Sequence, residues 1–372
     1  TFKARYAGEV KNFDATKYMN PEAARKMARF SQYAVAAAKM ALDDASIEAN
    51  SDVIKDAAIF MGVGIGGFEV NEECCIKYSQ SPQHRLPPMT IPELIPNEAC
   101  GNISMAFGIH GPAHTVTTAC ASGSDALGDA LDFIRGGRRD ICLAGGSEST
   151  INGFGIAGFE VLHALSTSFA DNPAAASRPF DKKREGFVMG EGSAVFVLEE
   201  YEHAKKRGAK IYAELAGYGG TSDGYHLTAP NPDGVWGAAA MTEALKDAGV
   251  KPEEVQYYNA HGTATKKNDP CETQMLKIAF GEENAKKLHI SSTKSMTGHC
   301  LGATGAIEAM FAVKAIEEGF IPPTINLDEQ DVEGGCDLNY TPNKGIECKV
   351  DCAMSSTFGF GGHNGVIVLK RI

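Results

Sequence analysis

The sequence lacks any apolar run long enough to cross a membrane, and no signal peptide precedes its first predicted helix. It is also short of positive charge, with 35 lysines and arginines against 47 aspartates and glutamates and a net charge of −12. This balance argues against broad electrostatic binding to nucleic acid or to an anionic membrane surface. We therefore expect no nucleic acid partner, no membrane partner and a cytoplasmic location.

The ten cysteines have neither the spacing of a disulfide framework nor the paired C-x-x-C units of zinc sites. Most of them should be reduced and buried, and no metal site is predicted. A chain of 372 residues can nevertheless bury a large core, which favours two domains or one large double-layered unit.

Short β-rich runs alternate with helical patterns along the chain, which predicts an α/β protein. The predicted strands are 57–62, 114–118, 140–145, 193–199, 210–218, 255–260, 289–293, 353–357 and 365–370.

Two segments of the chain resemble each other. Residues 114–137 and 289–319 each read as a strand, a turn of small residues, an apolar helix and a glycine. Duplication is the simplest explanation, so we predict two similar halves, 1–204 and 205–372, whose central strands end at a shared cleft. The first half lacks a counterpart of the strand that opens the second half at 210–218.

The segment around Cys120 is the leading candidate for reactive chemistry, because a cysteine stands where β-branched residues give way to an amphipathic helix. A helix N-terminus carries unpaired N–H groups and a partial positive charge, which favour a thiolate and can hydrogen-bond an oxyanion. We therefore predict that Cys120 is a nucleophile. The duplication would place it opposite the turn at 294–299.

Three polar clusters each follow a predicted strand, at 259–265, 294–299 and 358–364. A histidine that leaves a strand into a loop of small residues is well placed to exchange a proton. Each residue taken singly has a structural explanation, since buried cysteines pack as small hydrophobes and glycine-rich segments form turns. A cysteine, two histidines and a lysine at one predicted sheet edge are a poor chance grouping, so we expect one active site.

Residues 62–67 match the G-x-G-x-x-G pattern of dinucleotide-binding proteins. A proline-rich loop follows about twenty residues later, where that pattern requires an acidic residue at a strand end. Nucleotide binding is therefore not predicted.

These residues together resemble the β-ketoacyl-acyl carrier protein synthases, above all their elongating type II branch. The likeness covers essentially the whole chain and is carried by 118–123, 176–181, 203–214, 322–327 and the three clusters above. It implies an α/β thiolase-like fold of two duplicated βαβαβαββ halves in five layers, with the N-terminal strand missing from this chain. The chain departs from the family pattern at Ala264, Cys300, Thr304 and His363.

Carried over residue by residue, the resemblance makes Cys120 the acyl-accepting nucleophile. His261 and His299 would act together on the malonyl thioester. Lys294 would support the histidines, and Glu308 would pair with this lysine.

The resemblance also implies the groups that surround the reacting atoms. The backbone N–H of Phe360 would complete an oxyanion hole with that of Cys120, and the Phe360 side chain would gate the acyl pocket. Thr263 and Thr265 would hydrogen-bond the pantetheine arm. Ile95 and Phe159 match the positions that shape the acyl pocket.

The implied reaction is a decarboxylating condensation of an acyl thioester with a malonyl thioester in fatty acid elongation, giving a 3-oxoacyl thioester and carbon dioxide. A thiolate suits it as both nucleophile and leaving group, and two imidazole N–H groups can stabilise the enolate. The related initiating synthases and degradative thiolases have another residue in place of one of the two histidines, and the noncatalytic chain-length partners lack the cysteine. Both histidines and the cysteine are present here, so the resemblance favours an active elongating enzyme. Two alternatives stay open: a ketosynthase subunit of a type II polyketide or polyene pathway, and a noncatalytic acyl carrier-binding partner.

The resemblance implies an acyl carrier protein as partner, malonyl and acyl thioesters as substrates, a homodimer and no cofactor, since the substrates travel on phosphopantetheine. Arg25 and Lys26 match a basic docking stretch of the family. A solvated helix face explains these two charges about equally well.

Overall fold

The computed structural model describes residues 2–83 and 85–372. The helices are α1 (Pro21–Ala24), α2 (Arg29–Asp44), α3 (Phe68–Gln80), α4 (Thr90–Leu94), α5 (Glu98–Phe107), α6 (Ser122–Arg135), α7 (Gly153–Val161), α8 (Tyr201–Lys206), α9 (Val235–Asp247), α10 (Asn268–Phe280), α11 (Glu282–Lys287), α12 (Lys294–Thr297) and α13 (Thr304–Glu318). The strands are β1 (Ala58–Gly62), β2 (Ala113–Val116), β3 (Ile141–Glu148), β4 (Gly192–Glu199), β5 (Glu214–Ser222), β6 (Tyr257–Asn259), β7 (His289–Ser291), β8 (Phe320–Ile321), β9 (Ile346–Glu347), β10 (Cys352–Gly359) and β11 (His363–Lys370).

All nine strands predicted from the sequence are present, with ends shifted by at most four residues. The short β8–β9 pair was not predicted. A strand of two residues gives too short a pattern to be distinguished from a loop in the sequence.

The strands form two main sheets with the same plan. The first has the order β2-β1-β3-β4 and the second the order β5-β11-β10-β6-β7. Strand β1 is parallel to β2 and β3, and β4 closes that sheet antiparallel to β3. Strand β6 is likewise parallel to β7 and β10, and β11 lies antiparallel to β10. This correspondence confirms the duplicated topology, and β5 has no counterpart in the described part of the first sheet; the boundary at residue 204 stays a prediction.

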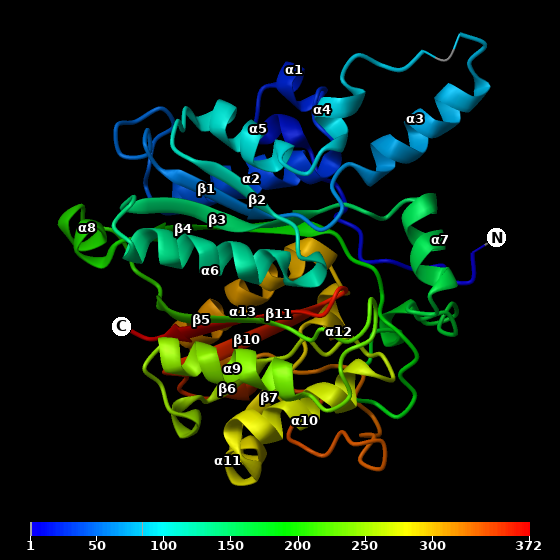
Figure 1. Ribbon diagram of the computed structural model, residues 1–372, viewed down its shortest axis with the longest axis vertical. Coiled ribbons are helices and arrows are strands. Elements are labelled where there is room, and N and C mark those ends of the chain that lie inside the picture. The colour runs from blue at the N-terminus through cyan, green and yellow to red at the C-terminus, as the bar shows by residue number, and fades with distance from the viewer. Residues whose placement is uncertain (1, 84) are drawn as a thin grey trace.

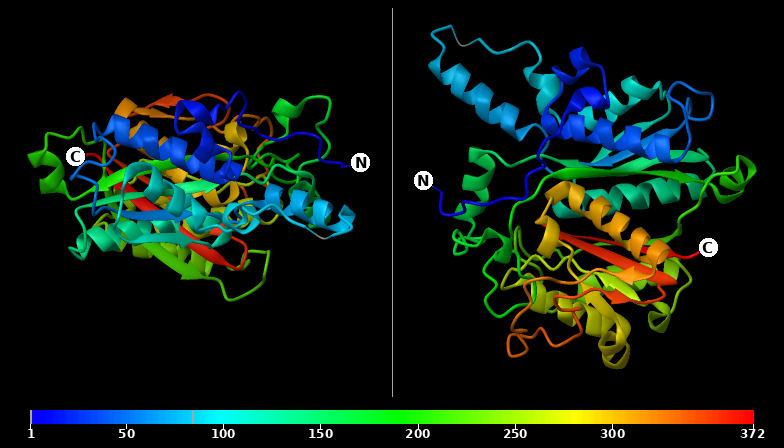
Figure 2. Two further views of the ribbon diagram at one scale, coloured as in Figure 1. Left: turned by 90° about the horizontal axis from the view of Figure 1, so that it is seen from above. Right: turned by 180° about the vertical axis from the view of Figure 1, so that it is seen from behind.

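Helices cover both sheets (Figure 1). Helices α2 and α5 lie on the outer side of the first sheet, α6 and α13 lie between the two sheets, and α9 and α10 cover the outer side of the second. Helix α3 projects beyond these layers, as Figure 2 also shows from two other directions. No helix within residues 2–83 and 85–372 combines the length and apolar composition needed to cross a membrane.

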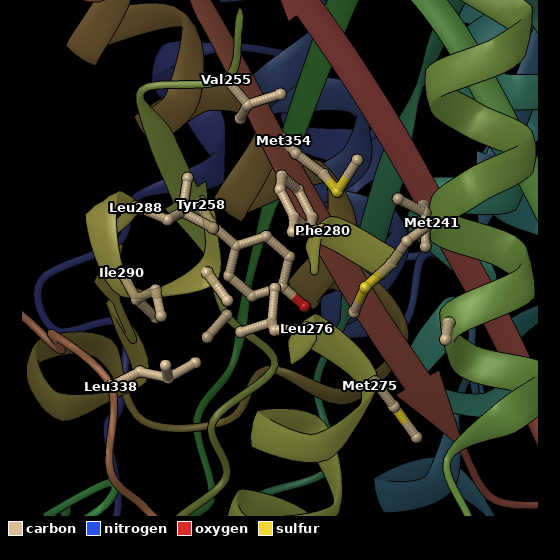
Figure 3. Close-up of a cluster of buried hydrophobic side chains, with 14 of the residues drawn as sticks. Met241, Val255, Tyr258, Met275, Leu276, Phe280, Leu288, Ile290, Leu338 and Met354 are labelled. Carbon is tan, nitrogen blue, oxygen red and sulfur yellow. The ribbon is translucent and has the colours of Figure 1, made fainter. Parts of the chain in front are cut away.

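The core of the second half is an apolar cluster between its sheet and the helices α9 and α10 (Figure 3). Tyr258 is fully buried in this cluster, and its hydroxyl donates a hydrogen bond of 2.8 Å to Oε1 of Glu272. Glu272 also binds the loop that follows β6, so the core fixes the position of that loop.

The two central helices approach each other at their N-terminal ends. A Cβ atom added to Gly123 in α6 would lie 2.8 Å from the backbone nitrogen of Ala306 in α13, and one added to Gly305 would lie 2.3 Å from Oγ of Ser124. Only glycine permits such close backbone packing. This packing brings the segments before α6 and α13 together.

Candidate active site

Cys120 lies in a 3-10 turn, Ala119–Ala121, that leads directly into α6. Ala119 has a φ of 52°, in the left-handed region that L-residues rarely adopt. This turn directs the Cys120 side chain toward the second half of the molecule. Cys120 is buried, with 8% exposure. The Sγ atom lies 3.1 Å from Nε2 of His299, which confirms that Cys120 faces the predicted turn.

The two histidines come from different elements of the second half. His261 follows β6, and its backbone N–H and that of Gly262 each donate a hydrogen bond of 2.7 Å to the carboxylate of Glu272. His299 stands between α12 and α13, and its Nδ1 lies 2.9 Å from Oγ1 of Thr304. The two imidazole rings are 5.3 Å apart and nearly perpendicular. The structure therefore brings both rings to the Cys120 sulfur.

Lys294 begins α12 and is 2% exposed. Its Nζ lies 2.5 Å from Oε1 of Glu308 in α13, so the two predicted partners form a buried pair. Burial raises the pKa of Glu308 to about 8, and the nearby ammonium is the strongest effect in the opposite direction. The pair supplies a positive charge close to the cysteine and the histidines without leaving it unpaired.

Burial dominates the protonation of the site. It lowers the pKa of His261 and of His299 well below the usual value, and the charge of Lys294 acts in the same direction. Both imidazoles are therefore neutral at physiological pH. A neutral imidazole offers one N–H donor and one acceptor nitrogen.

The expected thiolate at Cys120 is wrong for the resting protein. Burial raises the pKa of this thiol to about 12, although Lys294, the Phe360 backbone N–H and the cysteine's own N–H all lower it. The helix N-terminus acts in the predicted direction, but removal of the sulfur from water outweighs it. The thiol must therefore lose its proton to a neighbouring base, and His299 is in contact with it.

Phe360 stands in the tight turn between β10 and β11, where Gly359 pairs with His363. The backbone N–H groups of Phe360 and Cys120 both lower the pKa of the cysteine, so both act on its sulfur. Two converging backbone donors beside a nucleophile are the arrangement that stabilises an oxyanion.

The residues predicted to shape the acyl pocket lie in different surroundings. Phe159 of α7 packs in the apolar cluster that contains Cys120, and its ring lies 6.3 Å from that of Phe360. Ile95 is half-buried at the C-terminal end of α4 and is not part of this cluster.

The two threonines follow His261 in the same loop. The hydroxyls of Thr263 and Thr265 lie 3.0 Å apart, and the Thr265 oxygen accepts a hydrogen bond from the backbone N–H of Asn268. The hydroxyl pair is therefore next to the histidine, as expected for groups that bind an arm of the substrate.

Arg25 and Lys26 are exposed near α1, far along the chain from the buried site. Among residues 2–83 and 85–372 neither side chain has an ion-pair partner, whereas nearby Arg29 contacts Glu191 at 3.4 Å. These two side chains are available to an acidic partner.

Two buried carboxylates near the site were missed in the sequence. Glu272 holds the His261 loop, as described above. Glu148 accepts hydrogen bonds from the backbone N–H groups of Gly64, Ile65, Gly66 and Gly302. Neither stands in a sequence pattern that marks it, since each binds backbone N–H groups of another segment of the chain.

The contacts of Glu148 also bear on the dinucleotide pattern at 62–67. The N–H groups that would receive a phosphate there are bound to a carboxylate of the protein itself. This occupancy agrees with the rejection of nucleotide binding.

The chain is similar to known proteins over both of its halves. Residues 2–204 match the N-terminal domain of the beta-ketoacyl synthases, and residues 212–328 match their C-terminal domain. The chain is 46% identical over 367 residues to 3-oxoacyl-[acyl-carrier-protein] synthase 2 of Synechocystis sp., covering 99% of this chain and 87% of that protein.

Solved structures show the same likeness. A beta-ketoacyl synthase from Burkholderia phymatum is 35% identical with a TM-score of 0.92, and the match covers 100% of this chain and 89% of that chain. A type II PKS ketosynthase, solved in complex with its acyl-carrier protein and bound to the hexaketide, is 36% identical with a TM-score of 0.88 and the same coverage. The predicted thiolase-like fold is thereby confirmed.

Proposed function

Because this chain belongs to the β-ketoacyl synthase family, we propose that it condenses an acyl group on Cys120 with malonyl-acyl carrier protein in fatty acid elongation. The products are 3-oxoacyl-acyl carrier protein and carbon dioxide. The contact between the Cys120 sulfur and His299, with His261 beside them, is the observation that carries this proposal.

The first step transfers the acyl group to the cysteine. Cys120 gives its proton to Nε2 of His299 while the sulfur attacks the thioester carbonyl, whose oxyanion is held by the N–H groups of Cys120 and Phe360. The pantetheine sulfur then leaves and takes the proton. An acyl group and a proton have exchanged between two sulfur atoms, so the step is balanced.

The second step removes carbon dioxide from the malonyl group. Loss of carbon dioxide leaves an enolate, whose negative charge lies on the oxygen of the malonyl thioester. N–H donors from His261 and His299 stabilise this enolate in a water-poor site. The enolate carbon attacks the acyl carbonyl on Cys120, the carbon–sulfur bond breaks, and the released thiolate takes a proton from solvent.

Thr304 allows His299 to serve in both steps. In the first step Nδ1 must carry the hydrogen and donate it to the threonine oxygen, so that Nε2 can accept the thiol proton. In the second step Nε2 must carry a hydrogen, and the threonine hydroxyl then donates to Nδ1. A hydroxyl fits either tautomer at the observed 2.9 Å.

Other residues have supporting roles in this proposal. Glu308 holds the ammonium of Lys294 beside the histidines. Thr263 and Thr265 bind the pantetheine arm. Phe159 lines the acyl pocket, which agrees with its packing near Cys120. The placement of Ile95 in the pocket stays a prediction.

The partners follow from surface features. An acidic acyl carrier protein would dock on the exposed Arg25 and Lys26 in the cytoplasm. A homodimer would pair the edge strand β2 with its copy, since β2 bonds only to β1 in the described part of the chain. Met105 on the adjoining α5 is 71% exposed and adds apolar surface to that edge.

The alternative of a type II polyketide ketosynthase rests on the solved complex described above. The two pathways differ in the acyl chains that they extend, so a profile of primers and products distinguishes them. The noncatalytic alternative is disfavoured by the intact cysteine, and the absence of carbon dioxide release from malonyl-acyl carrier protein would support it.

The decisive experiment separates the two steps. Cys120→Ala should lose condensation but still release carbon dioxide from malonyl-acyl carrier protein, because both histidines remain. His299→Ala should lose carbon dioxide release by about 10²-fold or more. Condensation by the Cys120→Ala protein would refute the proposal.

A further inference from the structure

The site also gathers three side chains of the types that bind zinc. The Sγ atom of Cys120 and one nitrogen each from His261 and His299 all lie within 4.8 Å of one another. All three side chains are buried, with exposures of 8%, 3% and 2%. They come from three segments separated by 38 residues or more of sequence, which is why no spacing pattern in the sequence indicates a metal site.

We propose that Cys120, His261 and His299 form a reversible binding site for a zinc ion, which blocks the cysteine when it is occupied. Zinc binds sulfur at about 2.3 Å and nitrogen at about 2.0–2.1 Å, which places tetrahedral ligand atoms about 3.3–3.6 Å apart. Here Sγ and Nε2 of His299 are 3.1 Å apart. Movements of about 1 Å or less would therefore bring all three atoms to zinc distances.

The surroundings of the two histidines also fit a metal site. Metal-binding histidines commonly hydrogen-bond a second group through the other ring nitrogen, and Thr304 provides that contact for His299. Nδ1 of His261 is buried without a hydrogen-bond partner in the described structure, so no hydrogen bond at that nitrogen restrains its ring.

The cysteine must lose a proton when the metal binds. One zinc–sulfur bond forms, one S–H bond breaks, and the proton passes to solvent, so no oxidant or reductant is needed. The ammonium of Lys294, held by Glu308 at 2.5 Å, opposes the approach of a cation, which favours reversible binding over permanent binding. Three protein ligands leave the fourth zinc position open to water, so we expect a site that chelators can empty.

Cobalt is a useful probe because it takes the same ligands and absorbs light. The reduced full-length protein should bind one Co²⁺ per Cys120 and show thiolate-to-cobalt absorption in the near ultraviolet. Cys120→Ser should abolish this absorption, and His261→Ala should weaken cobalt binding at least tenfold. The matched control is Cys75→Ser, because Cys75 is the exposed cysteine beside Cys74 and should not contribute.

A second measurement follows Cys120 by alkylation with iodoacetamide and mass spectrometry of its peptide. Zinc should slow this alkylation at least tenfold, and a chelator should restore the rate. The proposal is overturned if the cobalt absorption survives Cys120→Ser, if it disappears in Cys75→Ser, or if zinc leaves the alkylation rate unchanged. Neither cobalt absorption nor alkylation measures condensation, so the outcome of both tests is independent of the proposed function.

Discussion

Replacement of Gly359 by alanine tests the oxyanion hole without touching a reacting side chain. A Cβ atom at Gly359 would lie 2.6 Å from the backbone oxygen of Thr118 and 3.1 Å from the backbone nitrogen of Cys120. Ordinary contact between such atoms begins at about 3.4 Å, so the end of β10 and the nucleophile turn must separate by about 0.8 Å. Both neighbours are backbone atoms, which cannot simply rotate away. Phe360 follows directly in the chain, so its N–H must shift relative to that of Cys120.

The expected loss follows from the geometry that an oxyanion requires. Donors are effective at about 2.7–3.1 Å, and loss of one donor costs about 10²–10³-fold in rate. We expect kcat/KM for acyl transfer to fall by about 10²-fold, while overpacking lowers the free energy of unfolding by about 1–3 kcal/mol. Acyl transfer is measured by rapid mixing and mass spectrometry of the Cys120 peptide.

Two controls isolate the effect of the N–H groups. Alkylation of Cys120 by iodoacetamide forms no oxyanion, so Gly359→Ala should slow it far less than acyl transfer. Gly101→Ala in α5 is the matched variant, because its Cβ would meet only the Glu98 side chain at 3.4 Å or more. Acyl transfer at the wild-type rate in Gly359→Ala would refute the assigned oxyanion hole.

Three further predictions concern the charges and protons of the site. Thr304→Val should lower the rate of carbon dioxide release about fivefold, because one neutral hydrogen bond of about 1 kcal/mol that orients His299 is lost. Thr304→Ser should restore the rate, and failure of that rescue would argue for a purely structural role of Thr304. Lys294→Met should lower the free energy of unfolding by about 3 kcal/mol, since it leaves Glu308 buried without its partner. The double variant Lys294→Met, Glu308→Gln should lose less stability than Lys294→Met alone. An equal or larger loss in the double variant would contradict the pairing of Lys294 with Glu308. The alkylation rate of Cys120 should rise about tenfold per pH unit between about pH 6 and pH 9, because a thiol with a raised pKa gains thiolate throughout that range; a plateau near neutral pH would show that the helix N-terminus outweighs burial.

Much of the fold was predictable because its signals are local. Strand β1 is a short run of apolar and small residues, and α6 presents its apolar side chains on one stripe. Such patterns need only neighbours along the chain. Even the duplication was visible, because both halves repeat the same order of strand, turn and helix.

The candidate site was predictable only in part. The sequence identified Cys120 at a helix start and a histidine at the end of each of two strand–loop segments. It carried no signal for Glu148 and Glu272, which hold the surrounding loops through backbone N–H groups 84 and 11 residues away in sequence. Burial and hydrogen-bond partners of this kind depend on which segments the topology places together.

The sequence by itself determined the chemistry that was available: a thiol at a helix N-terminus, two histidines and a lysine after strands, and glycines where backbones must approach. Only the tertiary structure decided how these groups act on one another. It placed Nε2 of His299 3.1 Å from a sulfur 179 residues away. It also reversed the expected charge of Cys120, because desolvation in a packed interior raises a thiol pKa more than a helix N-terminus lowers it. Desolvation depends on every element packed around an atom, and no single stretch of sequence contains that information.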